Sequence, residues 1–376
     1  MKQVRTKKIK IQPTGTMIQA MKNYLPACNW LSEIVLKNKE TKTNKLHKLY
    51  YSIIRSKFQL PSQVTCSLFR QVSVTYRSMK TKRKWKLAIF KKPVMPICFR
   101  RDFNVSKRNG FTIWNQPIQM FSDLPEANLK DSKIKNIKQK WYILLTYEIE
   151  IPDPKQQGTV VGVDRGIKRI LVASTKGKNP LFIKGGGLEH LRRNIQNTKS
   201  KVQAVGTRSS KRLLQRLRRK EKSVTEEVLH IASKTLAQYA ELVGAKTVVF
   251  ENLTESIRKS SKSKGKRFRK QVHRWPYSSL LFKCEYKLES RGIGLAFVNP
   301  KNTSRGCPSC GFVSEKNRKR LLFLCKSCGY SNDADLVGSI NIRNRFISEL
   351  LEKDDSEKGS SQSPIVADSY SLATSP

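Results

Sequence analysis

Apolar and polar positions divide the first 150 or so residues into one helical stretch and several β-type runs. Residues 1–13 alternate basic and apolar side chains, which predicts an edge strand. Residues 17–56 and 61–79 are predicted to be helices, because Pro61 suits a first helical turn and apolar side chains recur at three-to-four spacing at Val64, Leu68, Val72 and Tyr76.

Short β-type runs begin at residue 85 and are separated by turns rich in Pro, Gly, Asn and Lys: WKLAIF, VMPICF, GFTIWN and WYILLTYEIEI. Together with the first strand they predict a basic β-barrel or sheet made of residues 1–14 and 80–155. Residues 15–79 would then be a helical insert, and the Pro-Asp-Pro turn at 152–154 would end the domain.

The second half of the chain predicts a different architecture. Three strands (TVVGVD, RILVAS and PLFIK) precede a long helical stretch at 187–243, whose expected apolar stripe is Leu213, Leu217, Val224, Val228, Ile231, Leu236, Tyr239 and Leu242. The strand AKTVVFENL, a helix at 278–291, the strand GLAFVNP and a helix at 333–351 follow. The order βββ-α-β-α-β followed by a late helix is that of a ribonuclease-H-like core, so we expect a multidomain α/β fold.

The net charge of the chain indicates what kind of partner it binds. There are 75 Lys and Arg residues against 28 Asp and Glu, a formal net charge of +47, and the excess runs along most of the chain. Such a field binds a polyanion by counterion release, so a long nucleic acid is the expected partner. A ribosomal-type basic protein is the alternative on composition alone.

Three carboxylates stand out because acids are scarce. Asp164 follows the apolar run VVGV, Glu251 ends the run TVVF, and Asp335 begins the last helical segment. Each alone would ordinarily be a turn or cap residue. A cluster of buried like charges needs a cation, so together they predict a site for two Mg²⁺ or Mn²⁺ ions suited to phosphodiester hydrolysis. Asp333 competes with Asp335 for the third place, and could instead cap the helix.

Four of the eight cysteines predict a metal site. CPSCG and CKSCG are two CxxC turns separated by 14 residues, and each ends in Gly. Four thiolates close a tetrahedral shell around Zn²⁺, which leaves no open position and makes the zinc structural. A redox dithiol or an iron–sulfur site are the alternatives. The expected ligands are Cys307, Cys310, Cys325 and Cys328, in a zinc ribbon at residues 303–330 directly before Asp335.

Several of these stretches resemble one known family. GVDRGIKR, VVFENL, RWPYSSLLFKCEYKLESRGI, FVNPKNTSRGCPSCG and CKSCGYSNDADLVGSINI are similar to TnpB proteins of insertion-sequence transposons, which are RNA-guided DNA nucleases and apparent ancestors of the type V CRISPR effectors. The resemblance is strong over residues 160–345. It departs after the third acid, where Leu336, Val337, Gly338 and Ser339 stand in place of the common Asp-x-Asn-Ala-Ala pattern.

The resemblance implies roles for the residues singled out above. A RuvC-type triad would be Asp164, Glu251 and Asp335, in a nuclease domain made of residues 156–302 and 331–351. The barrel would be a wedge-like domain and the helical insert a recognition-like domain. The implied activity is Mg²⁺-dependent cleavage of double-stranded DNA, by a monomeric ribonucleoprotein whose guide RNA is derived from the transposon and which reads a short flanking motif.

Three other functions remain open on the sequence. A nuclease-silent RNA-guided repressor would be favoured by loss of an acid, and all three are present. A cut-and-paste transposase would share the triad, but the ribbon directly before the third acid speaks against it. A compact type V CRISPR effector would be revealed by a neighbouring repeat array.

The remaining segments give weaker signals. Eight of the 13 residues from 258 to 270 are basic, and they predict either a nucleic-acid clamp or a solvated loop: Arg258, Lys259, Lys262, Lys264, Lys266, Arg267, Arg269 and Lys270. Residues 352–376 are polar and Ser-rich, which favours a disordered tail. The N-terminal residues lack an apolar signal core, and no run approaches the length of about 18 apolar residues that spans a membrane. We therefore expect a nucleoid-associated protein of a prokaryotic cytoplasm, with no membrane partner.

Overall fold

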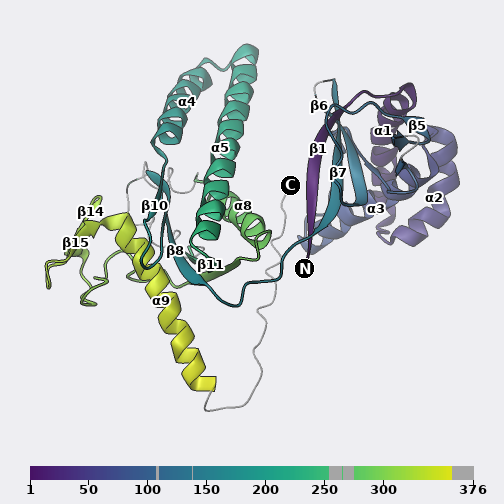
Figure 1. Ribbon diagram of the computed structural model, residues 1–376. Coiled ribbons are helices and arrows are strands. Elements are labelled where there is room, and N and C mark those ends of the chain that lie inside the picture. The colour runs from purple at the N-terminus through teal and green to yellow at the C-terminus, as the bar shows by residue number, and fades with distance from the viewer. Residues whose placement is uncertain (107–109, 138, 254–264, 266–274, 358–376) are drawn as a thin grey trace. The chain divides into compact units, whose positions relative to one another are not determined.

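The computed structural model describes residues 1–106, 110–137, 139–253, 265 and 275–357 (Figure 1). Within it the chain divides into two compact units, Met1–Glu150 and Ile151–Pro376. Among the described residues, no helix combines the length and the apolar character needed to cross a membrane.

The N-terminal unit begins with β1 (Lys2–Ile11) and continues into three helices, α1 (Gly15–Asn38), α2 (Thr43–Phe58) and α3 (Ser62–Thr81). The apolar stripe predicted for α3 is buried, and β1 is an edge strand as predicted. The single helix expected over residues 17–56 is wrong. The chain breaks at Lys39, which adopts a left-handed conformation, because no apolar side chain between Leu36 and Leu46 can hold a helix against the core.

Six more strands complete this unit: β2 (Val94–Ile97), β3 (Phe103–Ser106), β4 (Gly110–Ile113), β5 (Gln116–Pro117), β6 (Asn128–Ile137) and β7 (Lys140–Glu150). They pair as a four-stranded sheet, β1-β7-β6-β2, and a three-stranded sheet, β3-β4-β5. The sequence left open whether these strands form a barrel or a sheet, and the described strands form two separate sheets. The run WKLAIF forms no strand, whereas β6 does so although it contains four charged residues.

The C-terminal unit is built on one five-stranded sheet. Its strands are β8 (Thr159–Arg165), β9 (Arg169–Ser174), β10 (Leu181–Lys184), β11 (Ala245–Glu251) and β12 (Gly294–Val298), in the order β10-β9-β8-β11-β12. The first three pair antiparallel, and β11 runs parallel to both β8 and β12. This is the strand arrangement of the ribonuclease-H-like core that the order of elements predicts.

Helices cover both faces of this sheet. On one face, Val161, Val163, Val248 and Phe250 pack against α5 (Arg208–Leu242) and α8 (Tyr277–Glu289). On the other, Val249 and Val298 pack against Ile342 of α9 (Ala334–Glu357). Helix α9 extends past residue 351 to Glu357, so residues 352–357, expected in the tail, are helical. The rest of that tail lies outside the described residues.

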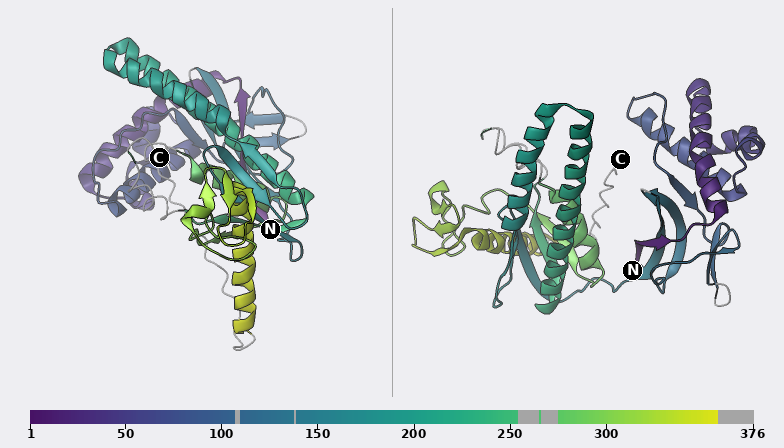
Figure 2. Two further views of the ribbon diagram at one scale, coloured as in Figure 1. Left: turned by 90° about the vertical axis from the view of Figure 1, so that its left-hand side faces the viewer. Right: turned by 90° about the horizontal axis from the view of Figure 1, so that it is seen from above.

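The long helical stretch is a hairpin of two helices, α4 (Gly186–Val205) and α5, which lie side by side (Figure 2). The stripe predicted from the large apolar residues is partly wrong, since Ile231 is 60% and Leu242 85% exposed. Leu236 is buried as predicted, and Val224, Val228 and Tyr239 are partly buried against the core. The other buried positions near them mostly carry smaller side chains that the prediction left out, namely Thr225, Leu229, Ala232, Ser233, Ala237 and Ala240.

Candidate active site and cysteine metal centre

Asp164 and Glu251 lie at the same end of two neighbouring parallel strands. The backbone pairing of β8 with β11 ends at Val163 and Phe250, so the next residue of each strand carries one acid. Because side chains alternate along a strand, both acids point to the face that α9 covers. Asp335 lies in the first turn of α9. Three elements far apart in the sequence therefore bring the three predicted carboxylates to one end of the sheet.

Two glycines let α9 approach this end of the sheet closely. A Cβ atom at Gly162 of β8 would lie 2.7 Å from the backbone nitrogen of Arg343 and nearer still to the carbonyl of Ser339. A Cβ atom at Gly338 would lie 3.2 Å from Oδ2 of Asp164. Gly338 belongs to the stretch that departs from the common family pattern, and it leaves room for the Asp164 carboxylate against the helix.

The electrostatics of the site are those of crowded carboxylates. Burial, together with the negative charges of Glu251 and Asp335, raises the pKa of Asp164 to about 7. Burial also raises the pKa of Glu251, against the lowering effect of a hydrogen bond that its Oε1 accepts from the hydroxyl of Thr303. Added cationic charge, such as that of a divalent metal, would favour the ionised forms of these carboxylates.

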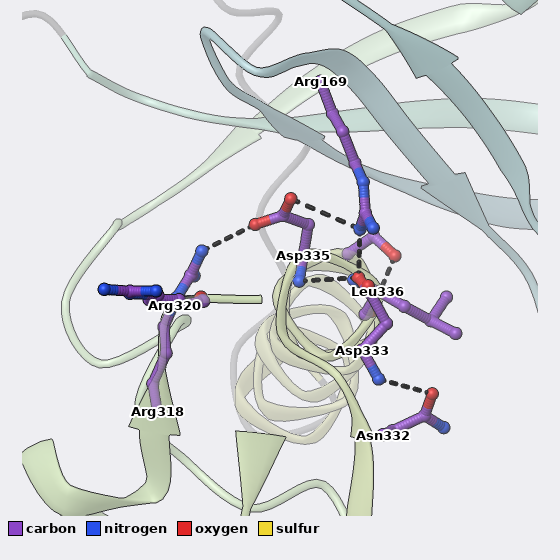
Figure 3. A network of polar contacts seen from close by, with 8 residues as sticks. Arg169, Arg318, Arg320, Asn332, Asp333, Asp335 and Leu336 are labelled. Atoms are coloured by element: carbon purple, nitrogen blue, oxygen red, sulfur yellow. Dashed lines mark hydrogen bonds and ion pairs between the residues drawn. The ribbon is translucent and has the colours of Figure 1, made fainter. Parts of the chain in front are cut away.

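Two arginines contact the third acid (Figure 3). Nη2 of Arg318, from β13 (Arg318–Lys319) of the cysteine ribbon, donates to Oδ1 of Asp335 at 2.6 Å. Nη1 of Arg169, at the start of β9, lies 3.4 Å from Oδ2 of Asp335 and also donates to Asp333. The Asp335 carboxylate is thus held between the sheet and the ribbon.

Asp333 does what its position before a helix suggests. Its Oδ1 accepts the backbone N–H groups of Asp335 and Leu336, each at 3.1 Å, which is the bonding of a helix N-cap. Burial raises the pKa of Asp333, but hydrogen bonds from Arg169 and from the N–H of Leu336 outweigh it and leave that pKa below its ordinary value. Asp333 is therefore the cap of α9, which leaves the third place in the acid cluster to Asp335.

The four predicted cysteines come together tightly. Their sulfur atoms all lie within 4.8 Å of one another, and among the described residues they are the one group of three or more His, Cys, Asp or Glu side chains that does so. The sulfurs of Cys307 and Cys328, and those of Cys310 and Cys325, are 3.6 Å apart. Tetrahedral zinc with bonds of about 2.3 Å requires sulfur separations of about 3.8 Å. The arrangement therefore suits a structural zinc ion.

The two CxxC turns have matching backbone geometry. Gly311 and Gly329, which follow them, have φ angles of 75° and 73°, a region that favours glycine. Backbone N–H groups of Cys328 and Ser327 point at the sulfur of Cys325 and lower the pKa of that thiol to about 6. A thiol of low pKa is readily deprotonated for metal binding.

The ribbon is connected to the acids on both sides. At its N-terminal end, Nδ2 of Asn341 in α9 donates to the carbonyls of Thr303 and Gly306 at 2.8 Å, which fixes the segment whose Thr303 hydroxyl bonds Glu251. At its C-terminal end, β14 (Leu322–Leu324) and then β15 (Ser331–Asp333) lead into α9, with Phe323 packed near Ala334 and Val337. The predicted bracing of the third acid thus has a physical basis.

Sequence reasoning missed Arg165, Arg169, Arg318 and Thr303. The three arginines carry no signal of their own in a chain with 75 basic residues, and Thr303 is recognisable only by its place before the first CxxC turn. The basic run at 258–270, predicted as a clamp or a loop, lies outside the described residues except for Gly265.

Comparison with known protein families gives two matches that together cover most of the C-terminal unit. A model described as "Probable transposase", of the OrfB type of the insertion sequence IS605, matches residues 144–257. A model described as "Cas12f1-like, TNB domain" matches residues 277–342, which include α8, the ribbon and the start of α9.

Individual relatives agree with these matches. A TnpB-like protein of Methanocaldococcus jannaschii is 33% identical over 234 residues, which cover 59% of this chain and 83% of the relative. The CRISPR-associated endodeoxyribonuclease Cas12f1 of Syntrophomonas palmitatica is 29% identical over 215 residues, which cover 53% of this chain and 41% of that protein. The alignments thus reach less than half of this longer nuclease.

Solved structures share the fold at low sequence identity. The mini-RNA-guided endonuclease CRISPR-Cas_phi3 superimposes with a TM-score of 0.53 at 11% identity, over 91% of this chain and 92% of that one. Fold, cysteine cluster and family matches place the chain in the RuvC-type nuclease class, as a homologue of the Cas12f endodeoxyribonucleases. Within that class the chain belongs to the TnpB family.

Proposed function

We propose that this protein is an RNA-guided DNA endonuclease in which Asp164, Glu251 and Asp335 are the catalytic residues. The observation that carries the proposal is the meeting of three carboxylates, from β8, β11 and α9, at one end of a ribonuclease-H-like sheet. Carboxylate oxygens are the ligands that Mg²⁺ and Mn²⁺ prefer, and the raised pKa of Asp164 marks a site that needs added positive charge.

The three acids would hold two Mg²⁺ ions, which supply an activated water and neutralise the leaving oxygen of the phosphodiester. Asp164 and Glu251, fixed by strand backbone, define one side of the site. Asp335, whose carboxylate contacts Arg318, would supply a ligand from the other side. Thr303 holds the Glu251 carboxylate in one orientation through its hydroxyl.

The guide and the target are proposed from charge and family. A net charge of +47 suits a large polyanion, and relatives of this chain are named as CRISPR-associated endodeoxyribonucleases. We assign a wedge-like role to residues 1–14 and 80–155, a recognition-like role to 15–79 and nuclease chemistry to 156–302 and 331–351. The ribbon at 303–330 would carry one structural zinc. The active particle would be one protein chain with one transposon-derived RNA and double-stranded target DNA beside a short flanking motif.

The test is expression of the protein with its native flanking DNA. The co-purified RNA is sequenced, and the particle is incubated with Mg²⁺ and a plasmid library in which the sequence beside the target is randomised. One discrete RNA and guide-dependent cleavage at a preferred flank are expected. Asp164→Ala, Glu251→Ala and Asp335→Ala should each abolish cleavage while RNA binding persists, and wild-type cleavage by any one of them would remove that residue from the active site.

A nuclease-silent repressor would give a discrete RNA and target binding without cutting. Heterogeneous RNA would contradict guidance altogether. A compact CRISPR effector is distinguished by a guide copied from a repeat array.

A further inference from the structure

Arg165 is placed on the opposite side of the sheet from the acids. It follows Asp164 on β8, so strand alternation turns its side chain toward the face covered by α5 and α8. There its guanidinium carbon lies 5.2 Å from the centre of the Phe250 ring, an arrangement of cation over aromatic face. Burial lowers the pKa of its guanidinium, against the raising effect of the nearby Glu251 carboxylate, and Cys284 and Tyr277 of α8 lie close by. Arg165 is thus a largely enclosed arginine behind the acid cluster.

The guanidinium of Arg165 donates a hydrogen bond to the backbone of the residue that carries the second acid. Nη2 of Arg165 donates to the main-chain carbonyl of Glu251 at 2.6 Å. The backbone pairing of β8 with β11 ends one residue earlier, at Val163 and Phe250. On the other side of β11, pairing with β12 continues to Glu251 and Val298, and the N–H of Asn252 donates to the carbonyl of Val298.

Glu251 is therefore held from β12 by backbone and from β8 by the Arg165 side chain. Without Arg165, the carbonyl of Glu251 would lose its partner on the β8 side, beyond the end of the backbone pairing. Because the Cα atom of Glu251 carries its side chain, movement of this backbone changes the distance between the carboxylates of Glu251 and Asp164. A metal site of fixed size is sensitive to that separation.

We propose that Arg165 is a positioning residue that fixes the spacing of the Asp164 and Glu251 carboxylates by bonding the end of β11 to β8 through its side chain. The inference rests on the proposed function, because it assumes that these two acids hold metal. It adds a residue that does not touch substrate or metal and acts from the far face of the sheet.

The geometry calls for a guanidinium in particular. One nitrogen must bond the Glu251 carbonyl while the planar group lies over Phe250, and Arg provides both in one rigid plane. Lysine keeps the charge and has a single compact donor that cannot stack in this way. Methionine keeps an unbranched apolar stem of similar length and loses the donors and the charge.

The experiment compares Arg165→Met and Arg165→Lys with wild type and with Arg192→Met. Arg192 is a matched control because its guanidinium carbon also lies over an aromatic ring, 5.4 Å from the centre of Trp275, and its Nε donates to Glu221, which is not one of the three acids. Zinc-loaded protein–RNA particles are titrated with Mn²⁺ and free ion is measured by electron paramagnetic resonance. The Asp164→Asn particle gives the background of ions bound by RNA. Thermal unfolding and cleavage kinetics are recorded in parallel.

We expect Arg165→Met to weaken acid-dependent Mn²⁺ binding by about 10–100-fold, the usual effect of removing a group that orients a metal ligand. The rate constant kcat should fall while KM for target DNA stays unchanged, and Arg165→Lys should lose several-fold in Mn²⁺ affinity. Arg192→Met should lower the unfolding temperature and leave Mn²⁺ affinity unchanged.

Unchanged Mn²⁺ affinity in Arg165→Met, or an equal loss in Arg192→Met, would overturn the positioning role. If Arg165→Met does not fold, Arg165→Lys decides by the same measurement, and wild-type affinity there would overturn it. A wild-type particle without any Mn²⁺ site that depends on Asp164 would overturn the proposed function as well. The two failures are thus told apart by the wild-type titration.

Discussion

The charge on Asp164 destabilises the ion-free protein, and its removal should therefore stabilise it. Burial and the charges of Glu251 and Asp335 raise the pKa of this carboxyl from 3.8 to about 7. A group whose pKa is raised on folding binds its proton more tightly in the native state. The free energy of unfolding accordingly falls as the pH rises from the pKa of Asp164 in the unfolded chain, near 4, to its pKa in the folded protein, near 7. It stays low above that pH.

The magnitude follows from that shift of about three units. Each unit corresponds to about 1.4 kcal/mol, so ionised Asp164 costs the folded state about 4 kcal/mol at pH 8. At pH 5 the remaining cost is about 2 kcal/mol, and near pH 4 it vanishes. Asp164→Asn removes the charge and keeps the shape. The variant should unfold about 10 °C above wild type at pH 8, given about 2–4 °C per kcal/mol for a unit of this size.

The assay is thermal unfolding of the zinc-loaded protein at pH 8, 6 and 5, in buffer cleared of other divalent ions. Added Mg²⁺ should raise the unfolding temperature of wild type at pH 8 and leave Asp164→Asn nearly unaffected, because the cation supplies the charge that the mutation makes unnecessary.

Asp333→Asn is the matched control, since the chemical change is identical and the expected sign is opposite. The pKa of Asp333 is lowered in the folded state, so its ionised form stabilises the protein above the unfolded pKa, and that contribution is lost as pH falls. Asp333→Asn should therefore destabilise the protein at pH 8. Equal stability of wild type and Asp164→Asn at pH 8, or a difference that does not shrink toward pH 5, would refute the reasoning.

Three further results are expected. Gly162→Ala should lower the free energy of unfolding by about 1–3 kcal/mol and abolish cleavage, because its Cβ would push α9 off β8. Circular dichroism and cleavage assays at 25 °C check this result. A fully active variant would contradict it. Cys325→Ser should lose zinc, measured by elemental analysis, together with thermal stability and activity; a zinc-free variant with full activity would rule out the structural role. Glu221→Gln should cost about 3–5 kcal/mol by leaving Lys199 buried without its charge partner, with urea unfolding as the measure and exposed Glu227→Gln as the neutral control.

The positions of the acids could be predicted because apolar runs fix where strands end. VVGV and TVVF each end in an acid, and parallel neighbours must place such residues side by side. The cysteine cluster could be predicted for a similar reason, since the spacing of a CxxC turn is set by the metal and not by the rest of the fold.

Contacts between distant polar groups could not be predicted in this way. Nothing in the local sequence distinguishes Arg318 from Arg320. Yet Arg318 bonds Asp335, whereas Arg320 is exposed, because Arg320 adopts a left-handed conformation in the turn that follows β13. The predicted α5 stripe is right at Leu236 and wrong at Ile231 and Leu242, because several buried positions of α5 carry small side chains such as Ala232, Ala237 and Ala240. Tight helix–sheet packing selects for small side chains, which a hydrophobicity pattern underweights.

The packing of α9 explains how the ribbon and the end of the sheet that carries the acids depend on each other. Helix α9 carries Asp335 at its start, Gly338 against Asp164 one turn later, and Asn341 against the segment entering the ribbon. A single rigid helix therefore sets the distances from the third acid to the first and from both to the ribbon. Two residues of the ribbon contact the acids in turn: Arg318 bonds Asp335, and Thr303 bonds Glu251. Loss of zinc should consequently disturb the second and third acids and leave Asp164, which is held by β8 and Gly338, in place.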